Sequence, residues 1–285
     1  MKKQENSRTI TTKLIDRYAA FLREQERSTA TIQKYVHDLG VLMAHSAGEP
    51  LTKTAVIAWK GSLSEDYAPA SINTMIAAAN GLFDFCGWAD LKVKPLKIQK
   101  SMFCDERKEL TRTEYVRLVN AATQEGNERL SLVIQTICAT GIRVSELRFI
   151  TVEAVLCGKT EINNKGKRRT IFLPEKLRKL LKKYLQKEKR TSGCVFITKT
   201  GKPLDRSNIW RDMKVLCESA GVEADKVFPH NLRHLFARTY YSIEKDLSRL
   251  ADILGHSNVN TTRIYTIESG MIHARQMERM SLIIT

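Results

Sequence analysis

The 285-residue sequence has few acidic side chains, few prolines and no paired cysteines. It contains 31 Asp and Glu against 47 Lys and Arg, and only 6 Pro. Hydrophobic residues still make up 42%, which excludes a disordered tail protein or a fibrous repeat. No Cys-x-x-Cys pair occurs, so neither a disulfide framework nor a clustered zinc site is expected. We interpret the cysteines as reduced, mostly buried thiols: Cys86, Cys104, Cys138, Cys157, Cys194 and Cys217.

Long apolar runs are also missing. The most apolar helix candidate, residues 130–141, is too short and too polar to span a bilayer. The first residues, MKKQENSRTITTK, lack the apolar segment of a secretory signal. We therefore expect a soluble protein of the cytoplasm with no membrane partner.

The sequence has a large excess of positive charge, a formal net charge of +16 at pH 7. Such an excess attracts polyanions, and nucleic acid is the commonest polyanion in a cell. An anionic membrane surface, an acidic protein partner or a merely basic surface are the alternatives on charge alone.

Residues 1–90 are expected to form a small helical domain. Four stretches carry apolar residues at helical spacing: 10–22, 32–43, 54–63 and 69–85. This periodicity predicts a four-helix bundle. Thr11 or Thr12 is predicted to cap the first helix, and Thr29 or Thr31 the second.

Residues 91–106 are predicted to link two domains, because the helical pattern stops and a proline appears among charged residues. Lysines recur along this segment: Lys92, Lys94, Lys97 and Lys100. They suit either an extended segment lying along DNA phosphates or a solvated linker, and the sequence leaves both open.

Residues 107–285 mix helices with short strands. Helical patterns cover 113–122, 128–140, 175–188, 207–219 and the chain from Asn231 onward. Strand-like runs cover 154–156, 160–162, 170–173 and 195–198. The middle two runs flank Asn163-Asn164-Lys165-Gly166-Lys167, which predicts a β-hairpin with a basic tip. The expected fold is mainly α-helical with a small antiparallel β-sheet.

Several short motifs carry side chains suited to chemistry: Gly141-Ile-Arg143-Val-Ser-Glu146-Leu147, the hairpin tip, Pro229-His230-Asn-Leu-Arg233-His234, and Leu254-Gly255-His256 with Tyr265 nine residues later. Each alone has a structural explanation, such as a helix-terminal arginine, a solvated tip or a core aromatic. His230 and His234 have the i, i+4 spacing of metal ligands. No carboxylate lies between them and Arg233 would repel a cation, so no metal site is predicted.

Together these residue types describe one chemistry. A phosphodiester under attack gains negative charge on its non-bridging oxygens, and fixed arginine donors stabilise that charge without a metal. A lysine can protonate the leaving 5′ oxygen, a histidine can accept or position a phenolic proton, and a tyrosine can form the covalent phosphoester. The set is therefore sufficient for cleavage of a DNA strand.

With these motifs the sequence resembles the tyrosine site-specific recombinases, or phage-integrase family, over nearly its whole length, in the two-domain Xer-like layout. The family's first arginine box is similar to residues 141–147, its His-x-x-Arg box to 230–233 and its Leu-Gly-His box to 254–256. The resemblance implies an N-terminal SAM-like core-binding domain followed by a catalytic domain over 107–285.

The resemblance also implies roles for single residues. Four of them are expected to contact the scissile phosphate: Arg143, His230, Arg233 and His256. Tyr265 is the expected nucleophile, and Glu146 is expected to hold Arg143. Lys165 is the predicted general acid, but the hairpin is about one residue shorter than the usual family turn, so Lys167 is the alternative. Lys167 and Arg168, with the linker lysines, are candidate DNA-phosphate contacts.

The implied function is site-specific recombination of double-stranded DNA core sites through a 3′-phosphotyrosyl intermediate and a Holliday junction, without metal or other cofactor. The implied assembly is a dimer on one site and a tetramer in the synapse, in the cytoplasm on the nucleoid of a bacterium or its mobile element. The alternatives are a type IB topoisomerase-like nicking-closing enzyme and a catalytically silent DNA-binding regulator. The sequence identifies neither the target site nor an accessory protein.

The C-terminal stretch 270–283 is predicted to form an amphipathic helix, because apolar residues alternate with Arg275, Glu278 and Arg279 at helical spacing. It can pack on its own domain or, as the resemblance implies, on a neighbouring protomer.

Overall fold

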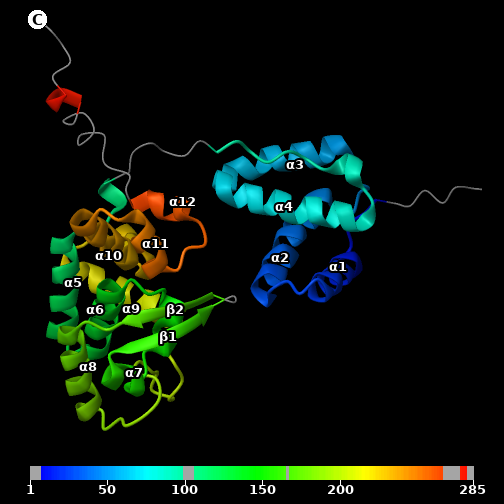
Figure 1. The fold of residues 1–285 in the computed structure, drawn as a ribbon. Helices are drawn as coiled ribbons and strands as arrows, with labels where there is room; N and C mark the ends of the chain where they lie inside the picture. Colours follow the sequence, from blue (N-terminus) through cyan, green and yellow to red (C-terminus); the bar gives the residue numbers. More distant parts are fainter. Residues whose placement is uncertain (1–7, 99–105, 165–166, 266–276, 281–285) are drawn as a thin grey trace, which may run out of the picture. The chain divides into compact units, whose positions relative to one another are not determined.

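The computed structural model describes residues 8–98, 106–164, 167–265 and 277–280. The chain divides into two compact units, residues 1–100 and 101–285 (Figure 1). The expected fold class is confirmed, because helices dominate both units and the described residues contain one two-stranded antiparallel sheet. Among these residues, no helix combines the length and the apolar character needed to cross a membrane.

The described part of the N-terminal unit contains four α-helices, as predicted: α1 (Thr12–Glu24), α2 (Thr29–Ser46), α3 (Lys53–Asp66) and α4 (Pro69–Cys86). Thr11 caps α1 by accepting a hydrogen bond from the Leu14 N–H at 3.2 Å. The prediction of Thr29 or Thr31 as the cap of α2 is wrong. Ser28 has the extended backbone that a cap needs and accepts from the Thr31 N–H.

Apolar side chains fill the centre of this unit. Trp59 of α3 and Leu82 and Phe83 of α4 are almost fully buried, together with the apolar faces of α1 and α2. Leu91 of the short helix η1 (Ala89–Leu91) belongs to the same core. Burial of this surface from water stabilises the bundle.

Two asparagines of α4 hold the chain that follows it. Asn80 exchanges hydrogen bonds of 2.9 and 3.0 Å with the backbone of Val93. Asn73 exchanges bonds of 2.9 and 2.7 Å with the backbone of Leu96. Their side-chain amides satisfy backbone groups that have no strand partner there.

The linker lysines differ in their surroundings. Lys92 forms an ion pair of 2.6 Å with Asp84, whereas Lys94 and Lys97 extend from exposed positions. Lys100 lies outside the described residues.

The second unit contains the remaining helices and the sheet: η2 (Glu106–Lys108), α5 (Arg112–Gln124), α6 (Glu128–Thr140), η3 (Val144–Phe149), α7 (Val152–Cys157), β1 (Lys159–Asn164), β2 (Lys167–Phe172), α8 (Glu175–Lys187), α9 (Arg206–Ala220), η4 (Ala224–Lys226), α10 (Pro229–Glu244), α11 (Leu247–Leu254), α12 (Val259–Thr262) and η5 (Arg263–Tyr265). Helix α6 is central, because α5, α8, α9 and α10 all pack against it (Figure 1). Its apolar residues are buried on nearly every side, as expected for a helix enclosed by others.

Two of the strand predictions are wrong. The run 154–156 lies in helix α7, which Thr151 caps at its start and Gly158 ends in a left-handed conformation. A short apolar run fits a strand or one helical turn equally well, and here the caps decide. The run 195–198 is not a strand, because its neighbourhood carries only the isolated bridges Thr151–Cys194 and Ile197–Pro203.

The hairpin prediction is confirmed. Strands β1 and β2 pair antiparallel from Lys159 opposite Phe172 to Asn164 opposite Lys167. Residues 165 and 166, which join the strands, are outside the described part of the chain. The predicted tail helix over 270–283 is outside it as well, except for residues 277–280.

Candidate active site

Arg143 stands where α6 ends. Gly141 follows the helix with φ +65°, and Arg143 then leads into η3. A Cβ at position 141 would overlap the ring of Phe236. Glycine is therefore required there both for the backbone conformation and for space.

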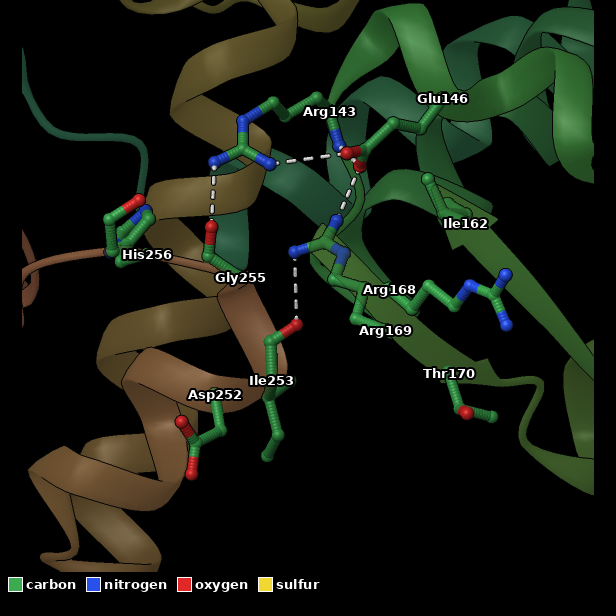
Figure 2. A pocket seen from close by; sticks show the side chains of 11 residues that line it. Arg143, Glu146, Ile162, Arg168, Arg169, Thr170, Asp252, Ile253, Gly255 and His256 are labelled. Atoms are coloured by element: carbon green, nitrogen blue, oxygen red, sulfur yellow. Dashed lines mark hydrogen bonds and ion pairs between the residues drawn. The ribbon is translucent and has the colours of Figure 1, made fainter. Parts of the chain in front are cut away.

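Glu146 holds Arg143 in place. Its carboxylate accepts from the Arg143 backbone N–H at 2.7 Å and from Nη1 at 3.1 Å, and only 2% of the Glu146 side chain is exposed. Arg143 Nη2 also lies 3.5 Å from the carbonyl oxygen of Gly255 (Figure 2). The Arg143 side chain remains 35% exposed, so a fixed guanidinium faces solvent and can bind an anion.

Arg233 is buried, with 1% of its surface exposed. Its guanidinium, carried by α10, donates to the carbonyl oxygens of Gly141 at 2.5 Å and Leu254 at 2.7 Å. Burial, and then the charge of Arg143, lowers the pKa of Arg233 to about 10, so it stays protonated at neutral pH. These bonds tie the ends of α6 and α11 to α10.

His256 follows Gly255, the left-handed residue that ends α11. Its Nε2 lies 3.1 Å from Arg233 Nη2 and its Nδ1 lies 2.8 Å from Thr262 Oγ1, so both ring nitrogens have partners. Burial, and then the charges of Arg233 and Arg143, lowers the pKa of His256 to about 4. The imidazole is therefore neutral at physiological pH.

Tyr265 lies at the end of η5 and is 4% exposed. Its ring belongs to a small apolar cluster with Ala237, Leu250 and Leu254. It stacks on His256 with ring centroids 6.2 Å apart and planes 18° apart. Burial raises the pKa of the Tyr265 phenol, and Arg233 opposes that rise. A protonated phenol is a weak nucleophile, so attack by Tyr265 requires a proton acceptor.

His230 lies in the first turn of α10 at an exposed position. Partial loss of hydration, followed by the effects of His234 and Arg233, lowers the pKa of His230 to about 4. Its ring centroid lies 4.6 Å from that of His234.

The structure thus brings five of the predicted residues into one region of the second unit: Arg143, His230, Arg233, His256 and Tyr265. Lys165 lies outside the described residues, and Lys167 is described only as the first residue of β2. The linker lysines belong to the other unit.

The sequence interpretation missed Arg169. This side chain is only 10% exposed, donates to Glu146 Oε2 through Nη2, and donates to the Ile253 carbonyl oxygen through Nη1 at 3.1 Å (Figure 2). It therefore connects β2, η3 and the end of α11. The signal was strand alternation, because Arg169 lies two residues before Ile171, which faces the core.

A pocket of about 790 Å³ opens beside these groups (Figure 2). Its lining includes Arg143, Arg169, His256 and Arg168, whereas the Glu146 carboxylate is already bonded to two of the arginines. Three guanidinium groups and a neutral imidazole around one opening suit a phosphate diester. Among the described residues, no group of three or more His, Cys, Asp or Glu side chains is arranged to hold a metal ion.

Comparison with known proteins gives the same assignment as the motifs. Residues 108–269 match the phage integrase family, and residues 15–90 match the phage integrase N-terminal SAM-like domain. The tyrosine recombinase XerA of Pyrococcus furiosus is 27% identical over 285 residues, covering 97% of this chain and 96% of the relative.

Two solved structures share the fold. A lambda integrase (75–356) dimer bound to a COC′ core site superposes with a TM-score of 0.75 at 18% identity, over 91% of this chain and 96% of that one. A lambda integrase tetramer bound to a Holliday junction superposes with a TM-score of 0.74 at 18% identity, over 92% and 78%. On these matches, the chain belongs to the phage integrase family and is a tyrosine recombinase, an enzyme of site-specific DNA recombination.

Proposed function

We propose that this recombinase cuts each DNA strand through a 3′-phosphotyrosyl bond to Tyr265 and rejoins it to a partner strand by way of a Holliday junction. The observation that carries the proposal is the stacking of Tyr265 on His256, which is itself bonded to the buried Arg233. The proposed nucleophile and two proposed phosphate-binding groups thus lie next to one another.

The cleavage step needs only side chains of this kind. Arg143, Arg233, His230 and His256 bind the non-bridging oxygens and stabilise the added negative charge of the transition state. The phenolic oxygen of Tyr265 forms a bond to phosphorus while the bond to the 5′ oxygen breaks. The phosphodiester energy is kept in the covalent intermediate, so rejoining needs no cofactor.

The general acid is proposed to be a lysine of the β1–β2 hairpin. The sequence prediction is Lys165. The alternative is Lys167, the first residue of β2. A substrate with a 5′-bridging sulfur needs no proton on the leaving group, so it restores cleavage in the variant that lacks the acid. Lys165→Ala and Lys167→Ala, each tested with the oxygen and sulfur substrates, identify the residue.

The DNA partner is proposed to be a duplex core site bound by two protomers, with four protomers in the synapse. The lambda integrase dimer on a core site and the tetramer on a Holliday junction support this assembly. The net charge of +16 supports phosphate contacts by Arg168, Lys167 and the linker lysines. Action on DNA also supports a place in the cytoplasm on the nucleoid.

The tail is proposed to dock on a neighbouring protomer. Truncation after Ser269 then leaves binding to a half-site intact but removes cooperative binding to the full site. Gel-shift titrations on both sites measure this, and undiminished cooperativity would assign the tail to its own domain.

Covalent trapping tests the function. The core site is first selected from a random duplex library by binding, and a nicked duplex that carries it is then incubated with the protein. The wild-type protein gives a denaturation-resistant protein–DNA band.

The Tyr265→Phe protein is expected to bind the duplex equally well but to give no band, because only the hydroxyl is removed. A band with the Phe variant would reject Tyr265 as the nucleophile. Joining of two duplexes distinguishes a recombinase from a topoisomerase-like enzyme, and any band excludes a silent regulator.

A further inference from the structure

The proposed mechanism uses His230 but leaves its i+4 neighbour His234 without a role. His234 Nδ1 lies 3.7 Å from Glu109 Oε1, at ion-pair distance. Arg238 lies one turn further along α10. Its Nη2 lies 3.0 Å from Glu109 Oε2 and donates to the Leu110 carbonyl oxygen at 2.8 Å. Glu109 is therefore held between two side chains of α10, in the segment that leads into α5.

His234 is also in contact with the nucleophile. Its ring centroid lies 5.0 Å from that of Tyr265, with the ring planes 83° apart. Its Nε2 is buried and has no hydrogen-bond partner among the described residues. Because a carboxylate beside Nδ1 favours the proton on that nitrogen, Nε2 carries the lone pair. A buried acceptor without a partner thus lies on a side chain that contacts the Tyr265 ring, while the Tyr265 hydroxyl, which must lose its proton, is hydrogen-bonded to Arg233.

The other two histidines of the candidate site are less suited to accept that proton. Both nitrogens of His256 already have partners, in Arg233 and Thr262. His230 and His256 each have a pKa lowered to about 4, with neighbouring arginines among the causes. A proton on either ring would add positive charge to a cationic cluster.

His234 has different neighbours. The titratable and charged groups around it are Glu109 from the segment before α5, His230 and Arg238 from α10, and Tyr265 from η5. His234, and also Arg238, hold the pKa of Glu109 below its usual range against the effect of burial, so the carboxylate is charged at neutral pH. Its negative charge stabilises an imidazolium at His234.

We propose that His234 accepts the phenolic proton of Tyr265 during cleavage and that Glu109 is the positioning residue that holds His234 and stabilises its charged form. The inference rests on Tyr265 being the nucleophile, as proposed above. The phenolic O–H bond breaks, the proton goes to His234 Nε2, and the phenolic oxygen bonds to phosphorus as the 5′ oxygen leaves with a proton from the hairpin lysine. In the rejoining step His234 returns the proton to Tyr265.

Single-turnover cleavage of the nicked core-site duplex, with protein in excess, tests this proposal. His234→Gln is expected to slow cleavage at pH 7 by about 100- to 10,000-fold, the range for a lost general base. Half-site binding in a gel shift stays unchanged, because the phosphate-binding groups are intact. His45→Gln, the same substitution at an exposed histidine of α2, is the matched control and keeps the wild-type rate.

The pH profile separates proton transfer from a structural role. In the wild type the rate rises with pH and then levels off, because a side-chain base and not solvent removes the phenolic proton. In His234→Gln this plateau is absent and the rate keeps rising with pH, because solvent must remove the phenolic proton. Glu109→Gln removes the negative charge beside His234, so the profile moves along the pH axis and the plateau falls about tenfold or more.

A His234→Gln protein that keeps the wild-type rate and profile overturns the proposal, as does one slowed equally at every pH. If His234→Gln fails to bind a half-site, the pH profile of Glu109→Gln tests the proposal instead. A Glu109→Gln profile that matches the wild type overturns the proposal. The assignment of Tyr265 as the nucleophile is tested separately. It fails if the Tyr265→Phe protein gives a covalent band.

Discussion

The two units of this recombinase bury different kinds of side chain. In the described part of the N-terminal unit the core is apolar, and Asp38 is its one buried polar side chain. The second unit, which contains the candidate active site and is called the catalytic unit below, buries more polar side chains. In its described part these are Ser131, Thr136, Thr140, Glu146, Asn231, Arg233 and Thr262. The first unit is stabilised mainly by removing apolar surface from water, whereas the second also encloses charged groups that must all be paired.

This difference shows where each unit is sensitive to change. Enclosing Glu146 and Arg233 costs hydration, and the ion pairs and carbonyl contacts offset that cost only while every partner is present. The gain is a guanidinium and an imidazole fixed before DNA arrives. Removing a partner from this network should therefore lower the free energy of unfolding more than removing a charged side chain from the surface.

The largest effect is expected for Glu146→Ala. The change leaves Arg169 buried without its carboxylate, so it should lower the free energy of unfolding of the catalytic unit by about 3–5 kcal/mol. Hydrogen exchange of the α6 and α10 amides measures this loss. Asp90→Ala removes the exposed ion pair with Arg8 in the N-terminal unit and should change little. If both variants lose the same free energy of unfolding, the two units do not differ in their sensitivity to the loss of an ion pair.

Leu82→Ala is expected to destabilise the N-terminal unit by about 2–5 kcal/mol, because it opens a cavity in a fully buried site of α4. Exchange should accelerate in α1 to α4 and remain slow in α6. Loss of protection in both units would mean that they unfold together, and the comparison would then describe one cooperative structure.

Acid should weaken the catalytic unit first. His230 and His256 have folded-state pKa values near 4, against about 6.5 when unfolded. Between these values the unfolded chain binds more protons, so stability falls as the pH drops from about 7 to 5. The N-terminal unit has its described histidines, His37 and His45, at exposed positions. Exchange rates at several pH values test this, and His256→Asn should reduce the slope.

The smallest effect is expected for Lys97→Ala, an exposed position of the N-terminal unit. If Lys97 contacts a phosphate, the slope of log binding constant against log salt falls by about one, with no change in stability or cleavage rate. An unchanged slope would assign Lys97 to the solvated linker.

Local sequence patterns predict most of the helices, because apolar residues at helical spacing and end signals such as Gly141 act within a few residues of each other. They also predict the hairpin. They fail for α7, where three apolar residues carry no periodicity, and at Ser28, where three neighbouring hydroxyl residues compete for one cap.

The site residues can be predicted from the sequence only in part, because their contacts depend on the tertiary fold. Arg143, Arg233 and His256 stand in recognisable motifs, and Glu146 lies in the motif of Arg143. The backbone carbonyls that Arg143 and Arg233 bind lie far along the chain from them. Arg169 sits in a run of three basic residues, Lys167-Arg168-Arg169, and nothing local separates it from the exposed Arg168. Its role depends on where α11 ends, which only the tertiary fold determines.

The close approach of Arg169 to Gly255 couples these two positions in any engineered or evolving variant. A Cβ at position 255 would lie 2.8 Å from Arg169 Cδ, on a backbone with φ +65°. A shorter side chain at 169 would remove the overlap but not the backbone strain, and it would also release Glu146. Single changes at the two positions are therefore non-additive, and the order in which they arise matters. A library that varies only position 255 should return glycine, and recovery of larger residues requires changes at both positions.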